Sequence, residues 1–344
     1  MKRKVLLFMP VVTLMSLVAC QKPEVPDRAV IDINQSSFTI GILQIADVGA
    51  LNLAREGFVN VVQNSPLLQD KELHFTYRNA HGDDVEQKNE ARSLVVNSDL
   101  LLGISTGSSQ DLKNARDEAG KKQPLLFTAV SDPVAASLVK RLVNTNGSVT
   151  GTSDDNPVEA QIQLIKKCLP GKDPRNIKLA ILYTAGEVNS RSQANRAKKA
   201  AKAEGIGKIG IETCTGVGDL QAAATKAARD YDVIYIPTDN NIADNMPTIK
   251  EAVDTYHTLC VVGEEGMLNG GHITYSISYS LLGKRTGEMA VDILTGTKKT
   301  HEIDVEKMLD EEYLSKVYSS TNLASSNIPG FDTSALEGFT DVDA

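Results

Sequence analysis

Several residue types are scarce in this chain of 344 residues. Tryptophan is absent, and aromatic residues make up only 5% of the sequence. Lys and Arg number 36 against 44 Asp and Glu, which argues against nucleic acid as a partner. The four cysteines and the histidines lack the spacing of metal ligands, so we expect neither a bound metal nor another cofactor.

Three cysteines lie beyond the N-terminal region: Cys168, Cys214 and Cys260. In an exported protein one pair of them could form a disulfide, which would leave the third unpaired. The surrounding sequence favours the alternative, in which all three are small apolar residues on one helix and two strands.

A single long apolar run is present, and it lies at the N-terminus. A basic stretch at 2–4 precedes apolar residues at 5–18, which is typical of a secretory signal. Leu-Val-Ala directly before Cys20 is the lipobox of bacterial lipoproteins, in which the cysteine carries the lipid, including palmitate. The alternative is a membrane anchor, which needs roughly 20 apolar residues, more than this run provides. We expect a signal peptide at 1–19 and a protein outside the cytoplasm, lipid-anchored to a bacterial membrane.

Loss of the signal peptide would remove three positive charges and change the formal net charge from -8 to -11. The next stretch, 20–37, contains two prolines and several charges, and is predicted to be a flexible lipidated tether. At the other end, 330–344 is acidic and weakly periodic. We predict a poorly ordered tail there.

Between these ends, short apolar runs alternate with helical stretches. The expected strands are 38–45, 73–77, 100–104, 125–130, 177–183, 209–214, 233–237, 259–263 and 273–277. The expected helices are 50–63, 84–97, 110–119, 157–168, 189–204, 220–230, 243–256 and 281–294. Such an alternation predicts parallel sheets covered on both faces. A stretch rich in Asn, Gly, Ser and Thr near 147–155 divides it, so we expect an α/β fold with two doubly wound lobes.

Ligands of doubly wound sheets bind at the carboxyl ends of the strands, beside helix N-termini. Hydroxyl residues follow the strands of the first series, and Glu, Asn and Asp follow those of the second. Hydroxyls suit a carboxylate and acids suit an ammonium, so the pattern favours a zwitterion between the lobes, although the same residues are ordinary helix caps. The candidate ligand-binding residues are Gln44, Thr106, Ser108, Thr128, Ser131, Asp132, Tyr183, Glu187, Asn189, Ser190, Asp239, Asn240, Glu264 and Tyr279.

These candidates have different expected roles. The ligand carboxylate is expected at Thr106, Ser108 and Thr128 of the first lobe. For the ammonium, Asp239 is the first choice and Glu264 the second. The expected hinge segments are 150–151, 278–279 and 297–300.

Five motifs that follow one another along the chain resemble those of a known family: 77–83, 127–133, 149–151, 186–190 and 237–240. They are similar to motifs of the substrate-binding lipoproteins of tryptophan-type ABC importers, over about 38–329, with Ser131 and His81 where Thr and Gln are usual. The resemblance implies a type I periplasmic-binding-protein fold with three crossovers.

The crossovers that this resemblance implies define the lobes. The first lobe would comprise 38–150 and 279–297, and the second 151–278 and 298–329. Helix 281–294 would return to the first lobe, and 301–306 would cross back. Some members of the family bind tryptophan or phenylalanine, and others have no established ligand.

Two patterns resemble enzyme motifs, and both are disfavoured. The G-x-G-x-x-G match at 205–210 follows a helix and precedes a strand, the reverse of a dinucleotide site. The G-x-S-x-G match at 103–107 would make Ser105 a nucleophile. His257 and His272 precede strands, however, and would lie at the opposite sheet edge. We therefore expect no enzyme, with a serine hydrolase as a remote alternative.

The favoured function is a lipid-anchored receptor that delivers a small molecule to an ABC permease and its ATPase. The ligand expected from the resemblance is an aromatic amino acid, with tryptophan first. Tyr77, Tyr183 and Tyr279 could flank its ring or could simply pack. The alternative is a sensor on the same fold that signals to a membrane partner, and neighbouring permease and ATPase genes would decide between the two.

Overall fold

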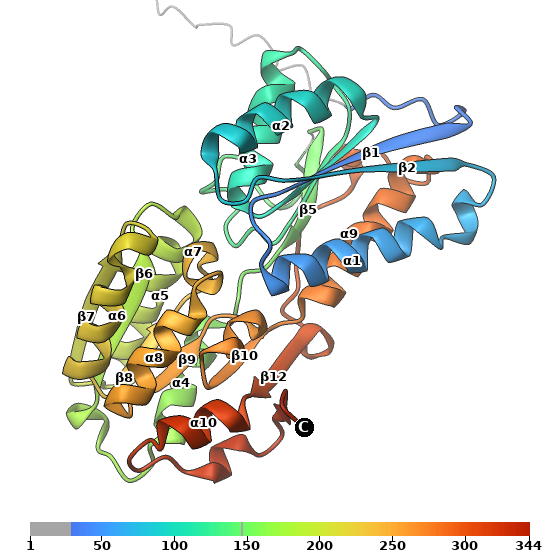
Figure 1. Cartoon of the computed structure of the whole chain (residues 1–344). Coiled ribbons are helices and arrows are strands. Elements are labelled where there is room, and N and C mark those ends of the chain that lie inside the picture. Colours follow the sequence, from blue (N-terminus) through green and yellow to red (C-terminus); the bar gives the residue numbers. More distant parts are fainter. Residues whose placement is uncertain (1–28, 146) are drawn as a thin grey trace, which may run out of the picture.

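The first lobe is built on a six-stranded sheet. The structure, a computed structural model, describes residues 29–145 and 147–344. Within them the strand order is β11-β5-β4-β3-β1-β2, and neighbouring strands are parallel (Figure 1). The bounds are β1 (Ser37–Gln44), β2 (Glu72–Asn79), β3 (Leu100–Ile104), β4 (Leu125–Thr128), β5 (Val149–Ser153) and β11 (Glu306–Lys307). The apolar strands β3 and β4 are buried along their whole length because helices cover the sheet.

The helices of the first lobe come from two distant parts of the chain. They are α1 (Gly49–Gln63), α2 (Asp84–Asn97), α3 (Thr106–Glu118) and α9 (Tyr279–Leu294), with the 3-10 helices η1 (Pro66–Leu68) and η4 (Thr300–Glu302). Helix α9, in the region expected at 281–294, packs along α1. A Cβ atom on Gly283 would lie 1.9 Å from the carbonyl oxygen of Ala54. The two helix backbones are therefore in direct contact.

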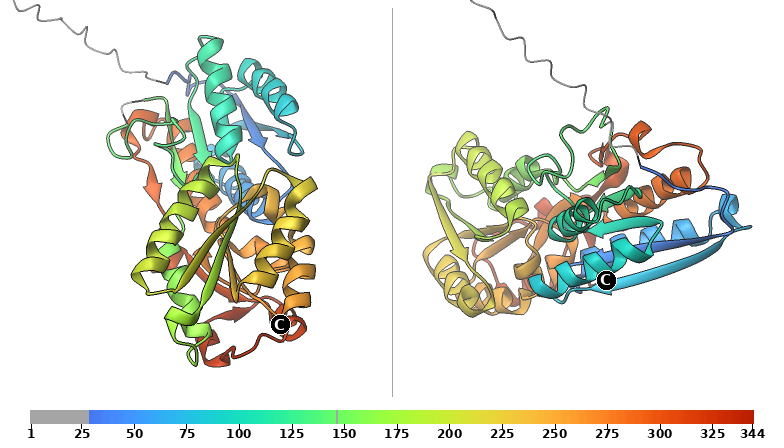
Figure 2. Two further views of the ribbon diagram at one scale, coloured as in Figure 1. Left: turned by 90° about the vertical axis from the view of Figure 1, so that its left-hand side faces the viewer. Right: turned by 90° about the horizontal axis from the view of Figure 1, so that it is seen from above.

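The second lobe is built on a seven-stranded sheet in the order β13-β12-β10-β9-β8-β6-β7, in which only the β10–β12 pair is antiparallel. Its strands are β6 (Lys178–Thr184), β7 (Lys208–Cys214), β8 (Val233–Ile236), β9 (Leu259–Val262), β10 (Ile273–Ile277), β12 (Leu314–Tyr318) and β13 (Thr340–Asp341). Its helices are α4 (Val158–Cys168), α5 (Val188–Ala203), α6 (Val217–Asp230), α7 (Asn240–Ala243), α8 (Met246–Tyr256) and α10 (Ser320–Ser326), with η2 (Pro174–Asn176), η3 (Glu265–Asn269), η5 (Glu311–Tyr313) and η6 (Thr333–Leu336). Figure 2 shows the two lobes from two other sides.

Three crossings join the lobes, at β5–α4, β10–α9 and β11–β12. Two of them differ from the sequence-based expectation. Residues 150–151 lie inside β5 and not in a hinge, and β11 pairs with β5 in the first sheet. The prediction that 301–306 crosses back is therefore wrong: Thr150 Oγ1 donates to the Ile303 carbonyl, and the chain leaves the first sheet only after Lys307.

The ends of the described chain also differ from expectation. Part of the predicted tether packs on the first lobe, since the Val30 amide donates to the Lys122 carbonyl and Lys71 Nζ donates to the Gln35 carbonyl. The predicted disordered tail forms η6 and β13, and Asp343 accepts hydrogen bonds from the Ser319 hydroxyl and a backbone amide at the start of α10. The acidic side chains thus serve as hydrogen-bond acceptors for the second lobe.

The expectations for 1–19 and for the lipid on Cys20 lie outside the described residues. Among the helices of 29–145 and 147–344, none combines the length and the apolar character needed to cross a bilayer. Cys168, Cys214 and Cys260 are buried and free, on one helix and two strands as expected. Burial raises the pKa of the Cys168 and Cys260 thiols to about 12.

Candidate functional site

A buried carboxyl group, Asp154, lies where the first lobe gives way to the second. It directly follows β5, and Oδ2 accepts a hydrogen bond of 2.6 Å from the hydroxyl of Tyr279, the first residue of α9. Only 1% of Asp154 is exposed, and this burial raises its pKa to about 7, although hydrogen bonds from Tyr279 and Ser131 oppose the shift. Asp154 therefore has an acidity suited to exchanging a proton near neutral pH.

A second buried carboxyl group, Glu264, approaches from the second lobe. It follows β9 as the N-cap of η3, where Oε2 accepts from the Gly266 amide at 2.6 Å. Burial raises its pKa to about 8, and the charges of Glu265 and Asp154 add to the shift. Burial raises the pKa of Tyr279 well above its usual value, with added contributions from the charges of Asp154 and Glu264. The charges of both carboxyl groups thus raise the pKa of the same tyrosine hydroxyl.

Each of these two acids keeps one oxygen without a partner. Asp154 Oδ1 and Glu264 Oε1 are buried and accept no hydrogen bond within the described part of the chain. A buried acceptor left in this way costs about 1–3 kcal/mol, and more if it is charged. An ammonium group carries three N–H donors and a positive charge, so it is a suitable partner for unpaired carboxylate oxygens of this kind. The arrangement is therefore suited to a ligand with an ammonium group.

The lobes also touch beside this acid pair. Gln193 Nε2 of α5 donates to Ser131 Oγ of the first lobe at 2.9 Å, and Gln193 Oε1 accepts from the Thr238 amide at 3.2 Å. Asn156 Nδ2 donates to Thr238 Oγ1 at 3.1 Å. A crevice of about 180 Å³ runs between the lobes here, lined by Ser131, Asp132, Pro133, Leu142, Asp155, Ser192, Gln193, Arg196 and Lys307. Ser131 thus lies at a contact between the lobes.

The basic residues of this crevice pair with the neighbouring acid, Asp155. Lys307 Nζ lies 2.6 Å from Asp155 Oδ2, and Arg196 pairs with Asp155 Oδ1. Arg196 also pairs with Glu159, at 2.7 Å. The two cations are thus engaged by carboxylates other than Asp154 and Glu264.

A second group of predicted residues forms a network inside the second lobe. Asp239 accepts from the amide and hydroxyl of Thr184 and from the Ile242 amide, at 2.7, 2.8 and 3.0 Å. Glu187 accepts from the amides of Asn240 and Asn241. Burial raises the pKa of Glu187 to about 7, with a contribution from the Asp239 charge.

This network makes Asp239 a poor partner for a ligand, because its oxygens already receive donors from its own lobe. Asn189 Nδ2 and Ser190 Oγ likewise donate to the Thr238 carbonyl, at 3.0 and 2.9 Å. Asn240 Nδ2 donates to Glu187. These side chains therefore hold the loop after β8 in place. The hydrogen bonds of Asp239 do not support the expectation that it is the first choice for the ammonium.

The residues expected to meet a carboxylate lie at the start of α3, which begins at Thr106, earlier than expected. The N-cap Ser105 has φ 92°, a backbone conformation that L residues rarely adopt. Ser108 Oγ donates to Gln87 Oε1 at 3.3 Å. Thr128 differs from expectation, because its hydroxyl is 3.1 Å from Thr152 Oγ1 in a buried chain of hydroxyls that continues to α9.

Three other candidates have local partners. Gln44 Nε2 donates to the Ala46 carbonyl and its Oε1 accepts from Arg55, while Arg55 lies 4.5 Å over the Tyr77 ring. Asp132 accepts from the Ala135 amide, which closes a turn. Tyr183 is half-buried against the core of the second lobe. The structure brings none of these three into contact with the acid pair.

The serine of the G-x-S-x-G match is tied into local structure. Ser105 Oγ donates to Ser108 Oγ at 3.3 Å, and Ser109 Oγ donates to the Ser105 carbonyl. The ring of His272 accepts from the Cys260 amide and contacts Ser326, and burial lowers its pKa to about 3. His257 also contacts Ser326, so both histidines lie at the far edge of the second lobe, as expected.

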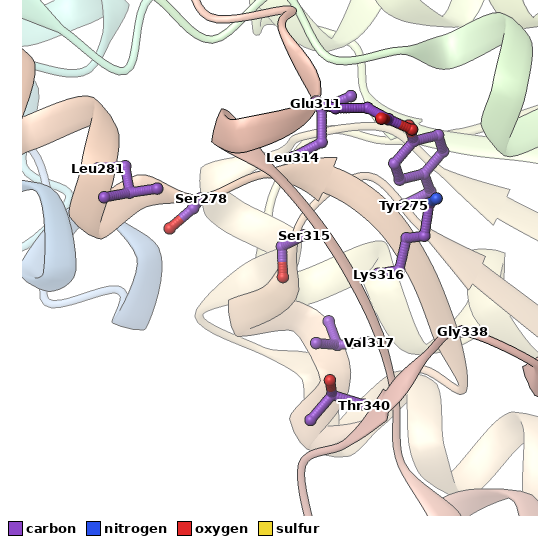
Figure 3. A pocket seen from close by; sticks show the side chains of 10 residues that line it. All are labelled: Tyr275, Ser278, Leu281, Glu311, Leu314, Ser315, Lys316, Val317, Gly338 and Thr340. Carbon is purple, nitrogen blue, oxygen red and sulfur yellow. The ribbon is translucent and has the colours of Figure 1, made fainter.

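A larger hollow of about 490 Å³ lies around β12, and neither Asp154 nor Glu264 lines it (Figure 3). Lys316 Nζ lies 5.0 Å over the Tyr275 ring on one side of the strand, and Ser315, Val317 and Thr340 lie on the other. None of the lining residues has a buried polar atom without a partner within the described ranges. The unpartnered, buried oxygens of Asp154 and Glu264 therefore make these two acids the candidate site.

Comparison with known proteins places this geometry in a family. The model of ABC transporter substrate-binding proteins matches residues 39–319. A tyrosine-binding protein of Clostridioides difficile (strain R20291) is 30% identical over 279 residues, which are 80% of this chain and 77% of that protein.

Two solved structures resemble this chain over most of its length. The ABC domain from Streptococcus pneumonia in complex with L-Trp is 27% identical, with a TM-score of 0.77 over 88% of this chain and 99% of that one. The ligand-free, open structure of a substrate-binding protein with adhesive properties from Clostridium difficile is 30% identical, with a TM-score of 0.64 over 85% and 95%. The family and the fold expected from the five motifs are confirmed: the chain belongs to the ABC transporter substrate-binding proteins and has the type I periplasmic-binding-protein architecture.

Proposed function

We propose that this protein captures an amino acid between its lobes, outside the cytoplasm, and delivers it to an ABC importer. The observation that carries the proposal is the pair of buried oxygens, Asp154 Oδ1 and Glu264 Oε1, which lie at the junction of the lobes without donors from the described residues. The ligand ammonium would donate to both. Because one acid belongs to each side of the junction, the ligand would hold the two lobes together.

The ligand carboxylate would meet the first lobe at the N-terminus of α3. The first backbone N–H groups of this helix have no partner inside it, and the helix dipole adds a partial positive charge of about half a unit. Thr106 begins the helix, and Ser108 lies in its first turn. A zwitterion spanning this helix end and the acid pair would contact both lobes through its two charged groups.

An aromatic amino acid is the ligand class that we favour, with tryptophan tested first. The relatives named above include a tyrosine-binding protein and an L-Trp complex, each at 30% identity or slightly below. Tyr279 donates its hydroxyl to Asp154, so its ring lies beside the proposed ammonium position. Such a ring can contact an aromatic ligand edge-to-face or in an offset stack.

Attachment to the membrane is part of the same proposal. The lipobox sequence before Cys20 supports a lipid on that residue, which would keep the receptor close to the permease. Metabolic labelling with palmitate measures this attachment: we expect label in the full chain and none in the Cys20→Ala variant. Equal labelling of the two proteins would contradict lipid anchoring.

The absence of tryptophan from the chain gives a direct test of the ligand. We expect purified full chain mixed with L-tryptophan to show indole emission shifted to the blue, because the ring leaves water on binding. The protein itself has no indole emission that could interfere. The titration should saturate at one ligand per chain, and scattering should show that the liganded protein is at least as compact as the free one.

The comparison ligands are L-tyrosine, L-phenylalanine, L-leucine and L-serine, and calorimetry measures the affinity for each of them. Tighter binding of the aromatic ligands supports the proposed class. Tighter binding of leucine or serine contradicts the aromatic assignment but leaves an amino-acid receptor. Failure of every amino acid to release or absorb heat contradicts the proposed function itself.

A further inference from the structure

We propose that ligand binding displaces protons from the pair formed by Asp154 and Glu264, so that the affinity for the ligand increases with pH. This inference rests on the proposed function, because it needs a ligand ammonium at the acid pair. It adds one property to that site: the fraction of receptor that holds ligand would depend on the pH outside the cell.

The geometry of the pair is the basis of the proposal. Asp154 accepts a hydrogen bond from the Tyr279 hydroxyl, Glu264 caps η3 of the second lobe, and each carboxyl group is only 1% exposed. Each keeps one oxygen that accepts no hydrogen bond from the described residues. Two carboxylates with so little hydration cannot both stay charged without a nearby cation, so in the ligand-free protein at least one carries a proton.

The surroundings of Asp154 supply no free cation among the described residues. From its own segment it faces Asp155, whose partners are Arg196 of α5 and Lys307 of β11. From α9 it faces the Tyr279 hydroxyl, and from the loop after β4 it faces Ser131. The neighbouring basic residues are thus already paired with Asp155 and, in the case of Arg196, also with Glu159.

The surroundings of Glu264 are similar. It faces Glu265 of η3 and Asp154 across the junction, and it receives the Gly266 amide. Glu265 accepts from Ser315 Oγ of β12 at 3.1 Å, and its own pKa is raised by burial. The groups that face Glu264 are therefore acidic or neutral, and a ligand ammonium would supply the compensating positive charge.

The direction of the pH dependence follows from the pKa values of Asp154 and Glu264. Burial raises the pKa of Asp154 to about 7 and that of Glu264 to about 8. An ammonium beside them stabilises the carboxylate forms and lowers both pKa values. The liganded protein then holds fewer protons than the free protein, so by linkage the affinity increases as the pH rises towards about 8 and levels off above it.

The proton balance is simple. The ligand ammonium keeps its three protons and donates hydrogen bonds. Each displaced proton leaves a carboxyl oxygen and passes to the buffer. Because the two carboxyl groups interact, the pair releases its protons as a unit, and we expect about one proton per ligand near neutral pH.

Calorimetry of the full chain with L-tryptophan or L-tyrosine tests this inference. Titrations at about pH 5.5, 6.5 and 7.5 keep the ligand ammonium charged. Each is done in two buffers of different ionisation enthalpy. We expect a heat that depends on the buffer, with about one proton released, and a dissociation constant that falls about tenfold per pH unit for each proton displaced.

The matched control is Glu187→Gln. Glu187 is also a buried acid with a raised pKa, but its oxygens already accept from Asn240 and Asn241. We expect Glu187→Gln to keep the proton release and Glu264→Gln to lose most of it. If Glu187→Gln loses it instead, the assignment to Asp154 and Glu264 is wrong.

The wild-type titrations decide the inference even if a variant fails to fold. Binding with a heat independent of the buffer and an affinity constant with pH would overturn the proton linkage while leaving the receptor function in place. Absence of any binding between about pH 5.5 and 7.5 would contradict the proposed function and the linkage together.

Discussion

The double variant Asp154→Asn, Glu264→Gln is expected to bind its amino acid about 10²–10⁴-fold more weakly than the parent. Each replacement removes a negative charge from a buried oxygen that we assign to the ligand ammonium. A hydrogen bond to a charged group contributes about 1.5–3 kcal/mol, and two such bonds account for the expected range. Calorimetry above about pH 8 measures the loss where the affinity of the parent no longer depends on pH.

The comparison variant for this experiment is Asp239→Asn. Asp239 accepts two hydrogen bonds from Thr184 and one from Ile242, so its replacement should lower the unfolding temperature. The affinity of the folded variant should stay within a few-fold of the parent. A larger loss of affinity in Asp239→Asn than in the double variant would show that the ammonium lies in the second lobe and not at the junction.

The Gly283→Val variant is expected to lower the free energy of unfolding by about 3 kcal/mol or more. A Cβ atom at this position would lie 1.9 Å from the Ala54 carbonyl oxygen, and that oxygen belongs to the backbone of α1. Helices α1 and α9 would have to separate along their contact, and the apolar side chains between them would lose packing. Urea unfolding monitored by circular dichroism measures the difference.

Gly218→Ala is the matched control for the helix packing. Gly218 lies in the first turn of α6, and a Cβ atom there would meet nothing within 4 Å. Because alanine favours the helix over glycine, we expect a gain of about 0.5–1 kcal/mol. If Gly283→Val unfolds at the same urea concentration as the parent, the close contact of α1 with α9 is not a source of stability.

The alternation of strands and helices could be predicted because the central strands are short apolar runs. Strand β5 was missed for the opposite reason. Its residues Thr150, Thr152 and Ser153 are polar, and they are buried because other elements satisfy their hydroxyls. Thr152 pairs with the hydroxyls of Thr128 and Thr286, whereas Thr150 and Ser153 donate to the carbonyls of Ile303 and Ser131. No hydrophobic period reveals such a strand.

The site was predicted only in part, and the reason is related. Glu264 and Tyr279 were candidates, whereas Asp154 was not, because it follows the strand that the sequence did not reveal. The sequence also could not rank Asp239 below Glu264. Whether a buried acid is satisfied depends on donors far along the chain, and the Thr184 amide that binds Asp239 lies 55 residues away.

The return of α9 to the first lobe has a consequence for how the protein forms after export. A chain that crosses a membrane from its N-terminus presents α1 first, long before α9 and β11 emerge. Until then the face of α1 around Ala54 has no helix to cover it, and the first sheet lacks its edge strand. The first lobe can therefore complete its folding only after β11 has emerged, and the late, long-range pairing of α1 with α9 delays the native state until most of the chain has passed.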